Sequence, residues 1–249
     1  MEQAAATPLD ATSLPLATPA HEPWSMTHLP SHMRLWLVTA VGLGIDLWSK
    51  EWAFSTLNPE EPRVLIHNFL SFQLSLNPGA LFGIGAGFAP IFVGASVLAL
   101  LFVLYLFANA GASRWSMHMA LGLVLGGALG NLYDRATQEA YVAYSSRGRD
   151  IGILVRETKT HVVIADFPKG GRERVVPCSD DGRSGRQPVV RDFIRIDARL
   201  AGYSLWPWIF NIADALLVVG VILLLWNFWF DRKHHAHAQE THAPSSPPA

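Results

Sequence analysis

Four long runs of apolar residues dominate the pattern along the chain. An α-helix needs about 20 mostly apolar residues to cross a bilayer, and each run meets or approaches that length. In the third run, glycines such as Gly126 and Gly130 would let neighbouring helices approach closely in lipid. The pattern therefore predicts an all-α membrane protein with four transmembrane helices, at Leu35–Phe54, Phe88–Ala108, Ser116–Tyr133 and Trp206–Phe230.

The two long connections between these runs contain short strand-like segments. Phe72, Leu74 and Leu76 alternate with polar residues, which is typical of a half-buried strand, and Asn77-Pro78-Gly79 then marks a turn. We therefore expect a small β-cradle within the loop 55–87 and a β-rich insertion at 136–189. The expected strands are Val64–Ile66, Phe69–Leu76, Ile151–Arg156, His161–Phe167 and Arg174–Val176.

Basic residues at the ends of the runs predict the orientation of the chain in the membrane. Arg34, Arg114, Arg232 and Lys233 flank the runs on one side, and such residues favour the cytoplasm. Residues 1–33 lack Lys and Arg and are rich in Ala, Pro, Thr and Ser, which predicts a disordered cytoplasmic tail. Residues 231–249 form a second, His-rich tail on the same side. Both loops, including the basic insertion, then lie outside, since long loops translocate largely regardless of charge.

Composition agrees with a bilayer and narrows the chemistry. Half of the residues are hydrophobic and 16% are charged, against about a quarter charged in soluble domains. The net charge of -1 gives no indication of nucleic-acid binding. A single cysteine, Cys178, excludes an intramolecular disulfide framework. Cys178 has only His161 nearby as a possible base, so a cysteine nucleophile is disfavoured.

Polar residues gather toward the outer ends of the predicted helices, where ionisable groups are costly and indicate function. Asp46 and Lys50 are four apart and share a helix face, and an ion pair that secures the first helix is their simplest interpretation. Asn131, Asp134 and Arg135 could mark the interface or the site, and Asn131 and Asn211 could bond between helices. The full set is Asp46, Lys50, Asn131, Asp134, Arg135, Asp192, Asn211 and Asp214.

Asp192 and Asp214 are the candidates for catalysis. Two carboxylates in a dry site can share one proton, so that one activates water and the other acts as an acid. This chemistry needs neither a metal nor a cofactor, and it would suit peptide hydrolysis. The two aspartates alone leave a proton-coupled transporter open as an alternative. Asp166-Phe167 is a second Asp-Phe pair that competes with Asp192-Phe193.

Five motifs in order resemble those of the lipoprotein signal peptidases (signal peptidase II), a bacterial family of aspartic membrane proteases. The resemblance covers residues 34–135 and 188–230. Between these parts, residues 138–187 exceed the family pattern. The motifs are Asp46-Leu-Trp-Ser-Lys50, Asn77-Pro-Gly79-Ala-Leu-Phe82-Gly83, Gly126-Gly-Ala-Leu-Gly130-Asn131-Leu-Tyr-Asp134-Arg135, Val190-Arg-Asp192-Phe193 and Phe210-Asn211-Ile-Ala-Asp214.

The resemblance implies that Asp192 and Asp214 are catalytic, while Asn77, Gly79, Asn131, Arg135 and Asn211 shape the substrate site. Asp134 would be a neighbour, and Asp46 and Lys50 would support the site. The implied substrate is a prolipoprotein with diacylglycerol on a cysteine, cut just before that cysteine. A monomer in contact with membrane lipid, in the bacterial cytoplasmic (inner) membrane with both termini cytoplasmic, completes the expectation. A structural membrane subunit would not need these motifs.

Overall fold

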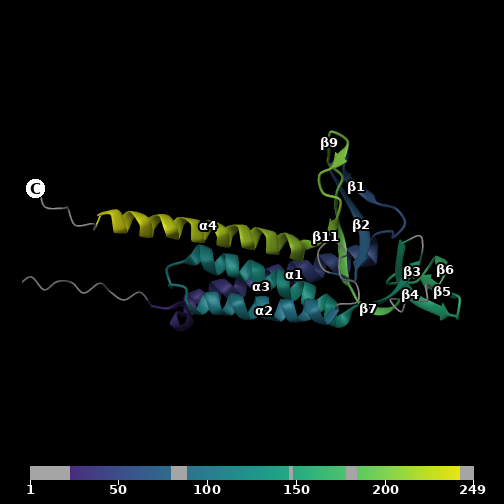
Figure 1. Cartoon of the computed structure of the whole chain (residues 1–249), viewed down its shortest axis with the longest axis horizontal. Helices are drawn as coiled ribbons and strands as arrows, with labels where there is room; N and C mark the ends of the chain where they lie inside the picture. Colours follow the sequence, from purple (N-terminus) through teal and green to yellow (C-terminus); the bar gives the residue numbers. More distant parts are fainter. Residues whose placement is uncertain (1–22, 80–88, 146–147, 178–183, 242–249) are drawn as a thin grey trace, which may run out of the picture.

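The computed structural model describes residues 23–79, 89–145, 148–177 and 184–241. Cys178, residues 1–22 of the first predicted tail and residues 242–249 of the second lie outside the described residues. Four long helices lie side by side at one end of the molecule (Figure 1). They are α1 (Leu29–Thr56), α2 (Ala89–Ala108), α3 (Trp115–Thr137) and α4 (Ile212–Thr241), preceded by the short 3-10 helix η1 (Ser25–Thr27).

Three antiparallel sheets lie beyond the other end of the bundle (Figure 1). The first has the order β1-β2-β8-β11 and joins parts of the chain far apart in sequence: β1 (Arg63–Ile66), β2 (Leu70–Asn77), β8 (Val190–Ile196) and β11 (Ile209–Phe210). The second has the order β6-β5-β4-β3-β7 and comprises β3 (Glu139–Ser145), β4 (Gly148–Glu157), β5 (His161–Ala165), β6 (Glu173–Pro177) and β7 (Gly185–Pro188). The third pairs β9 (Arg199–Leu200) with β10 (Tyr203–Ser204).

The predicted all-α class with four transmembrane helices is wrong. The sheets make up a large part of the described chain, and β3, β7 and β8 were not predicted as strands. Among the described residues, one helical segment, Ile212–Phe230, is long and apolar enough to cross a membrane. Helices α1 and α3 do not reach this apolarity because of their composition. Asp46 and Lys50 lower the mean hydropathy of α1, and the glycines and the polar end lower that of α3.

The start of the fourth helix also differs from the prediction. Residues 206–208 are not helical, Ile209–Phe210 pair with β8, and α4 begins at Ile212. Asp214 therefore lies in the first turn of α4 rather than deep within a helix. This places Asp214 beside the first sheet.

Helix α3 packs at the centre of the bundle. Its buried Leu121 and Leu125 contact Leu35 of α1 and Val103 of α2 in one apolar cluster. A Cβ atom on Gly122 would come within 2.8 Å of the Leu35 carbonyl oxygen, so only glycine permits this approach of α1. Because glycine lets the helix backbones touch, the positions of α1, α3 and α4 along the bundle axis are fixed relative to one another.

The five-stranded sheet is formed by the segment of the chain between α3 and β8. It begins where α3 ends, and β7 leads directly into β8. The Val189 amide donates to the Gln138 carbonyl at 3.1 Å, which joins the two ends of this segment. Phe167 packs edge-on against Phe54 of α1, in the apolar cluster that also contains Phe193 of β8. The insertion is therefore docked on the site end of the bundle.

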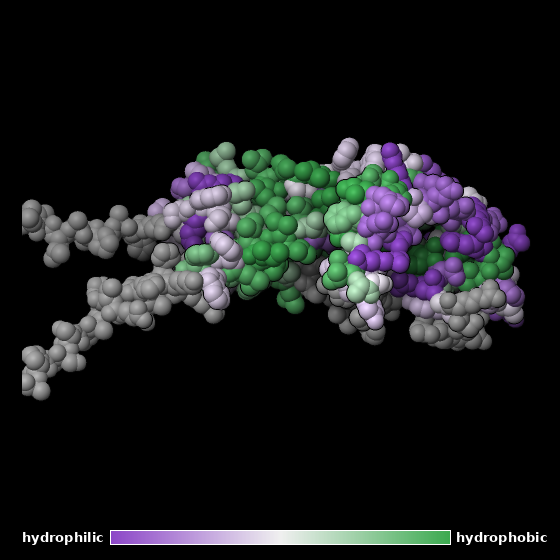
Figure 2. Space-filling view, turned by 90° about the horizontal axis from the view of Figure 1, so that it is seen from above, coloured by the Kyte–Doolittle hydropathy of each residue, from purple (hydrophilic) through white to green (hydrophobic). Residues whose placement is uncertain are grey.

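The outside of the bundle is strongly apolar. Figure 2 shows a hydrophobic surface over the helices and a predominantly hydrophilic one over the sheets. Large apolar side chains are exposed on three of the helices: Trp48 on α1, Leu98 and Phe102 on α2, and Leu225 and Trp229 on α4. Exposed apolar surface of this extent marks contact with a membrane or a partner.

Candidate active site

The first turn of α4 holds Asp214 through a capping box. Asn211, just before the helix, accepts from the Asp214 amide at 3.0 Å, and Asp214 Oδ2 accepts from the Asn211 amide at 3.3 Å. This reciprocal pattern satisfies helix N–H groups that have no partner within the helix. The carboxylate thus has a fixed place at the positive end of the helix dipole.

Asn211 also binds the second aspartate. Its Nδ2 donates to Asp192 Oδ1 at 2.7 Å and to Asn131 Oδ1 at 3.1 Å. Asn131 in turn donates to Asp214 Oδ1 at 2.8 Å. The two carboxylates, from β8 and α4, are therefore held around the same pair of amides. Asp192 is 2% exposed, whereas Asp214 is half-buried.

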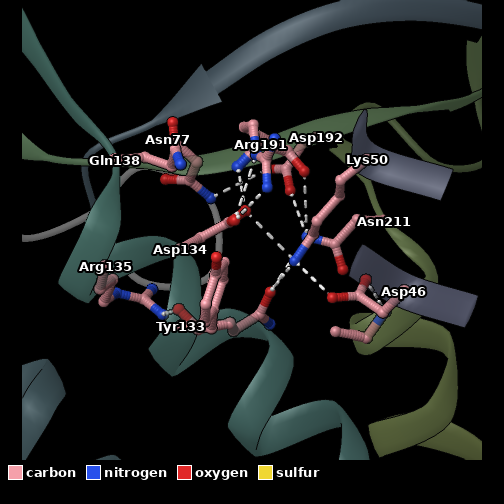
Figure 3. A network of polar contacts seen from close by, with 12 residues as sticks. Asp46, Lys50, Asn77, Tyr133, Asp134, Arg135, Gln138, Arg191, Asp192 and Asn211 are labelled. Atoms are coloured by element: carbon pink, nitrogen blue, oxygen red, sulfur yellow. Dashed lines mark hydrogen bonds and ion pairs between the residues drawn. The ribbon is translucent and has the colours of Figure 1, made fainter. Parts of the chain in front are cut away.

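A fully buried lysine, Lys50, reaches into the same polar network (Figure 3). Lys50 Nζ lies 2.8 Å from Asp46 and 3.3 Å from Asp134, and it donates to Asn131 Oδ1 at 3.2 Å. Asp46 Oδ1 accepts from the Ala213 amide at 2.8 Å. The predicted ion pair of Asp46 with Lys50 is present, and it also caps α4 and orients an amide of the site.

Asp134 faces a guanidinium from the strand that carries Asp192. Arg191 contacts Asp134 through its backbone amide at 3.0 Å, Nε at 3.1 Å and one terminal nitrogen at 2.9 Å. Its other terminal nitrogen lies 3.1 Å from Glu51. Arg191 is 5% exposed and Asp134 is fully buried. These contacts tie β8 to both α3 and α1.

The turn after β2 and the end of α3 form the remaining edge. Asn77 Nδ2 donates to Asp192 Oδ2 at 3.3 Å, and its Oδ1 accepts from the Gly79 amide at 3.0 Å. Arg135 donates to the Gly79 carbonyl at 3.1 Å and to the Asn131 carbonyl at 3.4 Å. The turn and its arginine therefore lie beside the carboxylates.

The two aspartates have different electrostatic surroundings. Burial raises the pKa of Asp192 well above its usual value, and the nearby charge of Asp214 raises it further. Hydrogen bonds from Asn211 and Asn77 and the charge of Lys50 oppose this rise in the pKa. Of the two carboxylates, Asp192 is the more buried.

All ten residues singled out in the sequence converge on one place. Asp166, the alternative to Asp192, lies in the turn after β5, with its carboxylate 3.2 Å from Arg174. Sequence reasoning missed Arg191 and Glu51 as members of the network. The Asn211-x-x-Asp214 spacing of a capping box was a signal that could have placed the start of α4.

No group of three His, Cys, Asp or Glu side chains that could hold a metal ion occurs among the described residues. The His-rich segment from 231 onward is described only as the helical end of α4, without its side chains.

Two carboxylates held around one pair of amides suit the acid and base chemistry of an aspartic protease. Residues 38–230 match the family model described as signal peptidase (SPase) II. The chain belongs to this family, whose members remove signal peptides from prolipoproteins.

Curated relatives carry the same description. The lipoprotein signal peptidase of Rhodopirellula baltica is 32% identical over 190 residues, which cover 74% of this chain and 66% of the relative. The lipoprotein signal peptidase of Desulfitobacterium hafniense (strain DCB-2) is 26% identical over 193 residues, which cover 78% of this chain and 91% of the relative. The family match over residues 38–230 spans the site motifs on both sides of the insertion.

Two solved structures described as a bacterial membrane enzyme share the fold. The structure at 2.3 Å resolution has a TM-score of 0.56 and 21% sequence identity, and it covers 92% of this chain and 99% of its own. The structure at 1.9 Å resolution has a TM-score of 0.53 and 22% identity, covering 84% of this chain and 96% of its own. They show that the overall fold of this chain occurs in other proteins.

Proposed function

We propose that Asp192 and Asp214 are the catalytic pair of this signal peptidase. The observation that carries the proposal is the shared amide pair, because Asn211 binds Asp192 at 2.7 Å while Asn131 binds Asp214 at 2.8 Å. Neither carboxylate contacts a cation in an ion pair among the described residues. Both therefore stay available for proton transfer, unlike Asp46 and Asp134.

The surroundings suggest a division of labour. Asp192 keeps the shared proton at rest because its pKa is raised, while Asp214 is the carboxylate at the N-terminus of α4. A water between them attacks the scissile carbonyl carbon and gives its proton to Asp214. Asp192 donates its proton to the carbonyl oxygen. Collapse of the diol then breaks the C–N bond: Asp214 gives its proton to the leaving amine, and one diol hydroxyl returns its proton to Asp192 as the new carbonyl forms.

The substrate is proposed to be a prolipoprotein with diacylglycerol on its cysteine, cut just before that cysteine. The exposed apolar surface of α1, α2 and α4 supports contact with lipid chains (Figure 2). Asn77, Gly79 and Arg135 are proposed to border the bound peptide. We further propose a monomer in the cytoplasmic membrane, with the start of α1 and the end of α4, which lie at the same end of the bundle (Figure 1), on the cytoplasmic side.

The test is cleavage of a diacylglyceryl-modified prolipoprotein by purified protein in detergent, followed on a gel. Asp192→Asn and Asp214→Asn should each lower kcat by about a thousandfold or more, because the residual rate without a catalytic group comes from binding alone. KM should change little. Asp166→Asn is the matched control from the second Asp-Phe pair, and it should cleave at the wild-type rate.

The outcomes separate the assignments. Wild-type cleavage by either Asp192→Asn or Asp214→Asn, with the control unchanged, would exclude that aspartate from catalysis. Loss of cleavage in Asp166→Asn alone would move the catalytic pair to the insertion. Cleavage at a peptide bond other than the one before the lipidated cysteine, read by mass spectrometry, would overturn the proposed cut site.

A further inference from the structure

Four buried charges lie behind the proposed catalytic pair and balance one another. Asp46, Lys50 and Asp134 are fully buried, and Arg191 is 5% exposed. Two are negative and two are positive, and each touches an opposite charge within 3.3 Å. Glu51, which also contacts Arg191, is 76% exposed and is screened by solvent. The set is therefore neutral only while Arg191 is present.

Arg191 and Asp192 are neighbours on β8, and successive side chains of a strand point to opposite faces. The guanidinium of Arg191 holds one face of β8 against Asp134 with two of its nitrogens. On the other face, Asp192 meets Asn211. Asn211 Nδ2 also lies 3.4 Å from the Arg191 carbonyl oxygen. A rotation of β8 about its axis would therefore break both sets of contacts together.

A second route leads from Arg191 to the other aspartate. Asp134 lies between Arg191 and Lys50, and Lys50 donates to the Asn131 oxygen at 3.2 Å. The nitrogen of the same amide then donates to Asp214. Because Asp134 has two cationic partners, Lys50 remains free to hold the orientation of Asn131.

We propose that Arg191 is a positioning residue for the catalytic pair, because it fixes where Asp192 points and cancels the charge of Asp134 behind the pair. It acts through Asp134 and β8 and does not touch the substrate. This role rests on Asp192 and Asp214 being the catalytic pair. The family resemblance implies a role for Asp192 but none for its neighbour Arg191.

The sign of the electrostatic effect follows from the charges that face the pair. Without Arg191 the buried set is net negative, so the shared proton is held more tightly and activity persists to higher pH. Without the charge of Asp134 the set is net positive, so the shared proton is lost more easily and the alkaline loss of activity begins at a lower pH. The charged groups that lie near the pair are Asp46, Lys50 and Glu51 on α1, Asp134 and Arg135 on α3, Arg191 on β8 and Asp214 on α4.

The experiment measures kcat and KM against pH for matched variants in detergent. Arg191→Met should lower kcat about tenfold through lost positioning and move the alkaline limb of the kcat profile up. Asp134→Asn should move that limb down. Each shift should be about one pH unit, the size expected for a unit charge ~10 Å away at an effective dielectric constant of ~20. KM should stay within about twofold, since neither group touches substrate.

Two further variants make the result decisive. The double variant Arg191→Met/Asp134→Asn restores neutrality, so its alkaline limb should return to the wild-type position although kcat stays low. Arg191→Lys keeps the charge without the two-pronged contact, so it should keep the limb and lose part of kcat. Arg195→Met is the control on the same strand, because Arg195 is 41% exposed and pairs with Asp197. It should behave as wild type.

The proposal is overturned if Arg191→Met and Asp134→Asn shift the limb in the same direction or not at all while their melting temperatures show folded protein. If Arg191→Met does not fold, Arg191→Lys and Asp134→Asn carry the same comparison of sign. Failure of the catalytic assignment reads differently, because Asp192→Asn or Asp214→Asn would then cleave at the wild-type rate.

Discussion

Asn211 shows how one neutral residue contacts two carboxylates, because its side chain donates to Asp192 Oδ1 and its backbone amide donates to Asp214 Oδ2. Its nitrogen donates to Asp192, its oxygen accepts from the Asp214 amide, and the residue is fully buried. A cation in this place would bind both carboxylates and lower their ability to exchange a proton. An amide orients them without removing their basicity, which is the requirement for acid and base chemistry in one site.

At this residue scale, the raised pKa of Asp192 predicts a pH dependence of stability. In an unfolded chain, Asp192 ionises with a pKa of about 3.9, whereas burial raises its pKa in the folded protein. The folded state therefore prefers the protonated form, and its stability falls as pH rises from about 4 through the raised pKa. Asp192→Asn cannot ionise and should escape this loss.

The measurement is the melting temperature of both proteins in detergent between about pH 4 and pH 9. The variant should gain on wild type as pH rises, and the two should differ least at the acid end. Asp197→Asn, a variant outside the site, should follow wild type at every pH. A difference between wild type and Asp192→Asn that grows toward acid would contradict the raised pKa.

Among the elements, α3 depends most on the absence of side chains. A Cβ atom on Gly130 would overlap Asp46 Oδ2 and come within 3.3 Å of the Ala213 Cβ. Asp46 cannot retreat, because Lys50 and the Ala213 amide hold its carboxylate. Because α1, α3 and α4 approach closely at this level, Asp46 can cap α4 while it pairs with Lys50 on its own helix, α1.

Gly130→Ala should therefore destabilise the protein and impair the site together. Overpacking of a dense core costs about 1–3 kcal/mol, and displacement of Asp46 should lower kcat through Lys50 and Asn131. Thermal unfolding and kcat should both be measured. Gly44→Ala is the control on α1, because nothing lies within 4 Å of the added Cβ. Equal effects of the two substitutions would show that the close approach at Gly130 is unimportant.

The elements also show what the sequence could and could not predict. The alternation at Phe72, Leu74 and Leu76 predicted β2, and the apolar runs located the helices. Hydropathy could not show that α4 starts at Ile212, since Trp206 and Trp208 are as apolar as the helix that follows. Strand β8 pairs with β11 and with β2, which lies more than a hundred residues earlier in the sequence, and periodicity carries no information on such pairing. Motif order singled out residues that the fold brings together, but it could not reveal that Arg191 contacts Asp134.

At the scale of the whole molecule, the insertion is the part that departs from a minimal enzyme. The site residues lie outside it, on α1, β2, α3, β8 and α4. Its contacts with the rest of the protein include Phe167 against Phe54, the Lys169 ammonium on the Ser55 carbonyl, and Arg172 with Glu60 at 3.3 Å. The last two involve exposed groups, so Phe167 contributes the most to docking among these three contacts.

This arrangement allows a deletion that respects the backbone. Tyr141 on β3 pairs with Arg186 on β7, so replacing residues 142–185 by Asn-Gly leaves a short hairpin closed by a favoured two-residue turn. The shortened protein should still cleave lipid-modified prolipoprotein, because every proposed catalytic contact remains. It should melt at a lower temperature, because the cluster beneath Phe193 loses an aromatic ring.

Phe167→Ala in the full chain separates these two effects. Phe167 is half-buried, so its truncation should cost about 2–3 kcal/mol, less than the 3–5 kcal/mol of a fully buried phenylalanine. If the insertion acts on the site only through this ring, the deletion and Phe167→Ala should reduce kcat to the same extent. Complete loss of cleavage in a folded deletion variant, with Phe167→Ala still active, would instead show that the five-stranded sheet itself contacts the substrate.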